Sequence, residues 1–381
     1  MKFQKTLLAA ALTLGVASAQ AQQSSVTLFG LVDLGLQYAS VSAPNLDSRS
    51  HLGMASGQSR PSVFGIKGVE ALGNGNSVVF NLTSAFNASN GQTGESNQLF
   101  NQQATLGVRN ESLGQVDFGR QTNMASKYFT SIDPFNTYFG QAGMGSSFGA
   151  TNNTRYSNMV MLQSVSYNGF SAGVGYSFSA GLPAVYGNSG VVTDGSGAFG
   201  TTNNQRAITI GGKYAQGPVQ VVATYDQVMP ANNVGNGNAS TPKQWIIGGA
   251  YDFNVVKASL AYGQVRGGWI TGTQPVSGSG LNPSWSNGGV LFQDGFGANS
   301  YLVGLEAPMS ERAKVFGSYQ LAQPTGNLTN FGANQSVYSA GYSYDFSKRT
   351  TAYTYVSYAQ NYLMVDGQKS TAFGVGMRHA F

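Results

Sequence analysis

The stretch VTLFGLVDLGLQY, residues 26–38, alternates between two kinds of side chain. One parity carries Val26, Leu28, Gly30, Val32, Leu34, Leu36 and Tyr38, whereas the other includes Thr27, Asp33, Gly35 and Gln37. Successive side chains of a β-strand point to opposite faces. An aspartate in mid-strand is costly against lipid and ordinary against water. We therefore expect a strand with lipid on one face and an aqueous lumen on the other.

The same alternation recurs along the rest of the chain. Apolar residues share one parity at 78–82, 104–108, 170–178, 208–214, 219–225, 245–253, 256–262, 301–305 and 338–344. Aromatic residues crowd the ends of these segments, as an interfacial girdle requires. The segment 351–360 has tyrosines on both parities, so the sequence alone does not orient it.

The connections between these segments alternate in length. Short turns are expected at 70–76, 110–114, 168–169, 215–218, 254–255, 308–312 and 346–349. Longer polar stretches lie near 39–60, 88–99, 123–154, 180–203, 229–243, 266–297, 322–334 and 361–370. Seven short and eight long connections join 16 strands, and an even count with both ends on one side is typical of an outer-membrane barrel. A barrel of this size has a water-filled bore.

The composition supports a membrane protein that crosses with strands. Only 9 % of the residues are charged, against about a quarter in soluble proteins, while Gly reaches 52, Tyr 20 and Phe 22. After residue 21 no run approaches the roughly 20 apolar residues that a spanning helix needs. A bilayer admits only helices or closed barrels. The fold class is therefore all-β, a transmembrane 16-stranded antiparallel β-barrel.

The first 21 residues have the pattern of a secretory signal peptide. Lys2 and Lys5 precede an apolar run, and Ala19-Gln20-Ala21 forms the cleavage pattern, which leaves 22–381 as the barrel domain. Losing these two lysines lowers the net charge from +5 to +3, which excludes a nucleic-acid partner. The chain has no cysteine, hence no disulfide or thiolate metal site, and no motif indicates a cofactor or metal.

The last strand also carries its apolar residues on one parity. In AFGVGMRHAF, 372–381, these are Phe373, Val375, Met377 and Phe381. We expect this strand to close the barrel against the first one and to place Phe381 at the lipid interface.

Seven stretches resemble the general diffusion porins of Gram-negative outer membranes, most closely those of β-proteobacteria. They are SSVTLFGLVDLGL, FGIKGVEALGNG, LFNQQATLGV, GQVDFGRQ, YDF, DFSKRTTAYTYVSY and GVGMRHAF. The resemblance implies a homotrimer in outer-membrane lipid and lipopolysaccharide, with the third external loop folded into the bore. It also implies passive diffusion of ions and small hydrophilic solutes, and recognition of Phe381 by the barrel-assembly machinery.

The candidate for that third loop is 123–154. It carries Phe129, Phe135, Tyr138, Phe139 and Phe148, which are many aromatics for a solvated loop and suggest packing on an inner wall. The alternative is an external loop at a trimer or lipopolysaccharide contact.

The resemblance also implies arginines on the wall facing carboxylates on this loop. Arg120 matches the wall pattern, and Asp133 is the one carboxylate in 123–154. Arg120 shares parity with Phe118, so it faces inward only past a bulge or above the lipid band. Val63, Gln102 and Met161 stand where relatives frequently have arginine, which implies a weaker field.

Five further basic residues are candidates for the constriction. Lys127 and Arg155 lie in or beside the loop, Arg60 precedes the second strand, and Lys67 and Arg109 fall on the lumen parity. A solvated wall or loop charge is the alternative for each. With a positive net charge and few carboxylates, we expect a mild preference for anions.

An enzyme is the rival class. His51 and His379 are the chain's two histidines, they belong to opposite ends of the barrel, and neither has a nucleophile in a recognisable pattern. We therefore expect no enzymatic activity. Two non-enzymatic alternatives stay open: a substrate-specific channel and a barrel acting mainly as an adhesin or structural protein.

Overall fold

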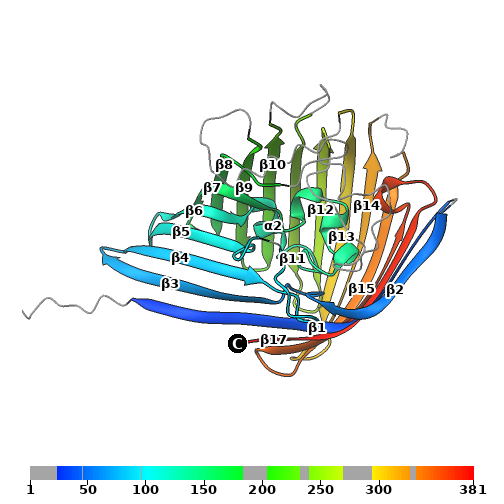
Figure 1. Cartoon of the computed structure of the whole chain (residues 1–381), viewed down its shortest axis with the longest axis horizontal. Helices are drawn as coiled ribbons and strands as arrows, with labels where there is room; N and C mark the ends of the chain where they lie inside the picture. Colours follow the sequence, from blue (N-terminus) through cyan, green and yellow to red (C-terminus); the bar gives the residue numbers. More distant parts are fainter. Residues whose placement is uncertain are drawn as a thin grey trace, which may run out of the picture.

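The computed structural model describes residues 24–44, 46–95, 97–182, 204–231, 240–268, 294–326 and 332–381, so the expected signal peptide lies outside the described residues. Figure 1 shows antiparallel strands following one another around a closed wall. No described helix is both long and apolar enough to cross a membrane.

Sixteen of the described strands form the ring. They are β1 (Ser25–Ala43), β3 (Val63–Gly73), β4 (Asn76–Ala85), β5 (Gln103–Asn110), β6 (Gly114–Thr122), β7 (Arg155–Ser164), β8 (Phe170–Ser177), β9 (Arg206–Gln216), β10 (Val219–Met229), β11 (Lys243–Asp252), β12 (Lys257–Arg266), β13 (Gly297–Pro308), β14 (Ala313–Pro324), β15 (Gln335–Asp345), β16 (Thr350–Gln360) and β17 (Lys369–Ala380). From β3 onward each pairs with the next, and β1 pairs with both β3 and β17. The predicted closed 16-stranded barrel is confirmed.

The region expected as the first long loop is mostly strand. β1 continues to Ala43 and pairs with β2 (Leu46–Ser56), which extends beside the upper half of β1. The prediction of a loop over 39–60 was therefore wrong, because the polar side chains of this stretch hide a β-ladder. The break comes later, at 57–62, where Gly57 has a φ of 76° and Pro61 lacks an N–H for the ladder.

Asp33, the mid-strand carboxylate of the opening stretch, holds this break in place. Its Oδ2 accepts hydrogen bonds from the backbone N–H groups of Ser59 (2.9 Å) and Arg60 (2.8 Å). Its Oδ1 accepts the hydroxyl of Tyr353 from the other side of the β1–β17 seam. The carboxylate is fully buried, so it faces the interior as predicted but serves as a structural anchor.

The outward parity is apolar along the ring. Leu28 is 67 % exposed, Leu106 59 % and Leu260 61 %, values that only a lipid surround makes favourable for so many large apolar side chains. The structure also orients β16. Tyr353 and Tyr355 are buried on the inward face, while Val356 and Tyr358 are exposed on the outward one.

All seven short turns fall where they were expected. In the turn between β7 and β8, Asn168 and Gly169 have φ angles of 48° and 85°, the left-handed pair that a tight hairpin needs. Barrel closure involves Phe381, whose backbone exchanges two hydrogen bonds with Gly30 (3.0 and 3.1 Å). A Cβ on Gly30 would lie 2.2 Å from the Phe381 ring, so this ring covers the glycine.

Candidate channel constriction

Residues 123–154, here called the inner segment, lie against the inward face of the wall. The segment contains α2 (Met124–Phe129), η1 (Gly140–Ala142), η2 (Met144–Ser146) and η3 (Gly149–Thr151). Figure 1 shows α2 within the ring. Hydrogen bonds join the segment to five strands, listed here by donor and acceptor: Met124 N to Thr209 Oγ1, Ala150 N to Gln244 Oε1, Gln320 Nε2 to Ala142 O, Gln335 Nε2 to Ser146 O and Gln141 Nε2 to Ser357 O. These bonds reach from β9 to β16.

Aromatic packing strengthens this attachment. Phe129, Phe135 and Phe148 are fully buried, and Phe139 nearly so. The rings of Phe135 and Phe316 lie 5.0 Å apart, and Phe139 lies 5.0 Å from Tyr355 in an edge arrangement. Such pairs contribute about 0.5–1.5 kcal/mol each beyond their buried area.

Glycines on the wall make room for the segment. A Cβ on Gly248 would lie 2.8 Å from the Phe129 ring, and one on Gly304 would lie 2.5 Å from Pro134. The neighbouring inward side chains Ala261, Ile246 and Leu302 are small or apolar and buried. The lumen parity of β11–β13 is therefore a packing surface for the inner segment, and it is not lined by water.

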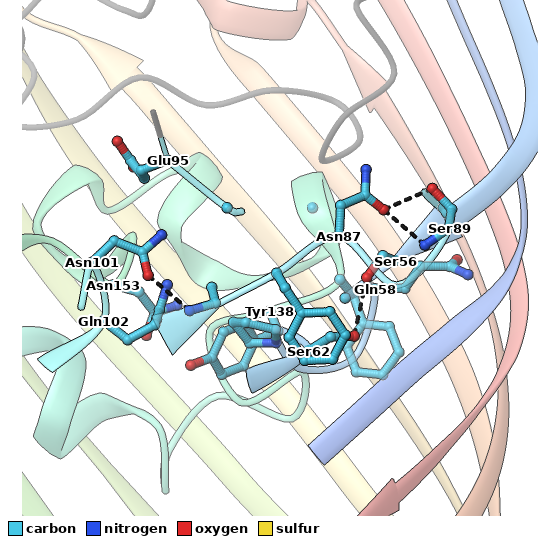
Figure 2. Close-up of a pocket in the computed structure, with 18 of the residues that line it drawn as sticks. Ser56, Gln58, Ser62, Asn87, Ser89, Glu95, Asn101, Gln102, Tyr138 and Asn153 are labelled. Carbon is cyan, nitrogen blue, oxygen red and sulfur yellow. Dashed lines mark hydrogen bonds between the residues drawn. The ribbon is translucent and has the colours of Figure 1, made fainter. Parts of the chain in front are cut away.

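Open space remains on the opposite side of the lumen. A cavity of about 920 Å³, here called the long-loop cavity, lies between the inner segment, β2, the 57–62 break and the β4–β5 connection. Figure 2 shows Gln58, Asn101 and Tyr138 at this cavity. A second cavity of about 230 Å³, the short-turn cavity, is lined by β1 and β3–β6.

The structure places three of the predicted bases on these cavities. Lys67 and Arg109 line the short-turn cavity together with Asp117. Arg155 lines the long-loop cavity, and its Nη1 donates to Asn153 O at 2.9 Å. These three agree with the expectation of a basic lumen on this side.

Lys127 lies on α2 and faces the wall at β6 and β7. Its Nζ donates to Gln163 Oε1 (3.2 Å) and Gln121 Oε1 (3.3 Å) and lies 3.1 Å from Met161 Sδ. Burial lowers the pKa of Lys127 to about 8, and the nearby Asp117 carboxylate opposes that shift. A lysine in this position is charged at neutral pH and loses its charge in mild alkali.

Arg60 is exposed in the 57–62 break. Across from it, Arg378 lies on the inward parity of β17, directly opposite Asp33 in the β1–β17 register, and its Nη1 donates to Ser59 Oγ at 3.4 Å. Sequence reasoning missed Arg378, although its parity with Gly374 and Gly376 was available.

Asp133 does not face the open side. Its side chain is 1 % exposed and accepts backbone N–H bonds from Phe135 (3.0 Å), Thr137 (2.8 Å) and Met144 (2.8 Å). Burial raises the pKa of Asp133 to about 6, against the lowering effect of these three bonds. The carboxylate folds the inner segment from within, so its predicted role as a pore-facing acid is corrected.

Arg120 also departs from its predicted place. The β6–β7 register pairs Gly119 with Met159 and then Gln121 with Tyr156, so the extra residue of the bulge belongs to β7. Alternation along β6 is unbroken, and Arg120 shares the outward face of Phe118. Its guanidinium donates from Nε to Asn101 O (2.8 Å) and from Nη1 to Ser157 Oγ (2.9 Å). The predicted pair of Arg120 and Asp133 across the constriction is therefore wrong.

A basic cluster was missed on the far side of the lumen. Lys257 and Lys314 contact Glu306 at 3.3 and 2.9 Å, while Lys213 Nζ donates to Ser131 Oγ at 3.3 Å and Lys257 Nζ to Ser131 O at 2.6 Å. All three lysines stand on the inward parity of their strands, which the sequence pattern already indicated.

The inward charges of the described ring are unbalanced. The bases on inward parity are Lys67, Arg109, Lys213, Lys257, Lys314 and Arg378, and the carboxylates are Asp33, Asp117, Asp226 and Glu306. Asp33, Asp117 and Asp226 are 3 % exposed or less. The charge offered to a passing ion is therefore mainly positive.

Comparison with known proteins agrees with the barrel and its internal segment. The family described as Gram-negative porin matches residues 6–362. The chain belongs to this porin family. It is 45 % identical to an outer membrane porin protein of Bordetella pertussis, covering 99 % of this chain and 100 % of that one. It is 27 % identical to outer membrane porin protein 32 of Delftia acidovorans over the same shares.

Solved structures show the same fold. An anion-selective porin from Comamonas acidovorans has a TM-score of 0.69 at 22 % identity, covering 94 % of this chain and 100 % of that one. A trimer form of an outer membrane protein of Vibrio cholerae has a TM-score of 0.61 at 16 % identity, covering 94 % and 99 %. The porin described here is therefore a passive channel of the outer membrane and not an enzyme.

Proposed function

We propose that ions and small hydrophilic solutes cross this porin through an off-centre path between the inner segment and the wall of β1–β6. The observation that carries the proposal is the attachment of the segment to β9–β16, which leaves both cavities on the other side. Solutes enter at the long-loop cavity and leave through the short-turn cavity. The width between these cavities limits solute size.

We further propose a mild preference for anions. Lys67 and Arg109 line the exit, Lys127 faces the wall between the cavities, and Arg155 and Arg60 lie on the entry side. In a narrow passage these charges attract anions and repel cations, with incomplete screening by salt. Arg120 and Asp133 are not assigned to the path.

The assembly is proposed on weaker grounds of similarity. We propose that residues 1–21 are removed on export and that the mature barrel forms a homotrimer in outer-membrane lipid and lipopolysaccharide. Phe381 is proposed as the residue that the barrel-assembly machinery recognises. The apolar outward belt and the described trimer form of the Vibrio cholerae protein support this arrangement.

Planar-bilayer recording of the purified protein tests the path. We expect uniform conductance steps in KCl and a reversal potential in a salt gradient that indicates anion preference. Deleting 128–140 should enlarge the steps. Cation preference would contradict the charge assignment, and unchanged steps after the deletion would contradict the role of the inner segment. On gels, the unheated protein should migrate as a trimer that heat dissociates.

A further inference from the structure

We propose that the long-loop cavity is a binding subsite for neutral solutes rich in hydroxyl groups, with mono- and disaccharides as the class. This inference rests on the proposed channel function and adds a preference among the solutes that pass. Eight carboxamide side chains line the cavity: Gln37, Gln58, Asn87, Asn90, Asn101, Gln102, Asn152 and Asn153. Its two charged residues, Glu95 and Arg155, have opposite signs. The lining therefore differs from the basic remainder of the path.

Two of these carboxamides are held so that they present donors. Asn101 Oδ1 accepts the backbone N–H of Ala85 at 2.8 Å, and Asn87 Oδ1 accepts the backbone N–H of Ser89 at 2.9 Å (Figure 2). A backbone N–H bonds only the oxygen of an amide, so both orientations are fixed. Neither Nδ2 group has a partner among the described residues, and both stay available to a solute.

Other groups present acceptors. Gln58 is 4 % exposed, and its Oε1 is buried without a partner in the described part of the chain. The side chain of Gln102 bonds to none of the described residues, so it offers both an acceptor and a donor. Buried carboxamide atoms without partners are costly and gain from a bound solute.

This mixture selects among ligand classes. An inorganic anion accepts hydrogen bonds only, and a metal ion contacts oxygens only. A sugar hydroxyl both donates and accepts, which suits neutral amides that present both kinds of group. Selectivity in channels follows from such lining donors and acceptors together with width.

Tyr138 adds an apolar face. It comes from the inner segment, is half-buried, and its ring stands at the cavity in Figure 2. Its hydroxyl has no hydrogen-bond partner among the described residues. Aromatic side chains with one apolar face and one polar tip suit ligands that have both C–H and hydroxyl surfaces. The cavity volume of about 920 Å³ admits a disaccharide with water.

The test measures block of KCl current by sucrose in planar bilayers. The reference solute is a methyl-capped polyethylene glycol of equal hydrodynamic radius, whose ether oxygens accept but cannot donate. We expect saturable block by sucrose beyond the effect of viscosity, and no saturable block by the glycol. Gln102→Leu and Tyr138→Leu should each weaken the sucrose block by about 2- to 12-fold, the range for one lost hydrogen bond. Gln216→Leu, an exposed carboxamide at the opposite end of the barrel, should leave it unchanged.

The outcomes separate the two proposals. Normal conductance steps with equal effects of sucrose and glycol would overturn the subsite alone. Saturable sucrose block that survives both Gln102→Leu and Tyr138→Leu would place the binding elsewhere and also overturn it. The absence of conductance steps in KCl alone would overturn the channel path and the subsite together.

Discussion

Lys127 should make ion selectivity depend on pH. The pKa of this lysine is lowered to about 8 by burial, so it is about nine-tenths charged at pH 7 and about one-tenth charged at pH 9. Raising the pH from 7 to 9 therefore removes most of one positive charge from the inner segment. The anion preference should fall as the pH rises, which is the opposite of what a titrating carboxylate would produce at acid pH.

The size of the effect follows from Coulomb's law. An ion about 4 Å from this charge gains or loses ~1 kcal/mol in a water-like medium. Screening in 0.1 M salt, with a Debye length of about 10 Å, reduces that to ~0.7 kcal/mol. Anions and cations respond with opposite signs, so their difference is ~1.4 kcal/mol. The anion-to-cation permeability ratio should therefore fall about tenfold.

Reversal potentials in a KCl gradient measure this ratio at both pH values. Lys127→Met fits beside Met161 and removes the charge, so it should show the low ratio already at pH 7. Lys127→Arg stays charged at pH 9 and should keep the high ratio. A wild-type ratio that is the same at pH 7 and pH 9, or a pH dependence retained in Lys127→Met, would refute the reasoning.

Three further predictions separate packing from permeation. Arg120→Gln should change the permeability ratio less than twofold, because its guanidinium lies on the outward face and bonds Asn101 and Ser157; a change as large as that of Lys127→Met would return it to the path. Gly304→Val would place a Cβ 2.5 Å from Pro134, so conductance noise should rise, whereas Gly212→Val, with nothing within 4 Å, should resemble the parent in the same recordings. Asp133→Asn loses at least one of three N–H acceptors at a cost of about 1–3 kcal/mol, which should speed protease cleavage within the inner segment.

The barrel was predictable because lipid imposes a period of two on every strand. Parity gave the outward faces, and it also placed Lys213, Lys257 and Arg378 inward, although these were not selected as site residues. The tyrosines of 351–360 resisted orientation because β16 has aromatics on both faces. Tyr353 and Tyr355 face inward to meet the aromatics of the inner segment, a tertiary contact that local periodicity does not contain.

The errors have a common physical cause. Asp133 was taken as a pore charge from its position in a loop, yet the contact of its Oδ1 with Phe135 N two residues on is a local turn pattern that an aspartate before proline favours. Arg120 was moved inward by similarity against its own parity, and the bulge that would have allowed this lies on β7. In both cases local rules predicted the observed placement better than the resemblance did.

The division of the lumen into a packed side and an open side explains why so few charges suffice for a water-filled barrel. On β9–β16 the inward face carries glycine, alanine and carboxamides that seat the inner segment, so those strands need no solvated lining. The open path is bounded by β1–β6, where Lys67 and Arg109 face water. Substitutions on the packed side should change the stability of the constriction, and substitutions on the open side should change which solutes pass. Because Lys127 belongs to the segment yet faces the β6–β7 wall, it is the residue through which both properties are coupled.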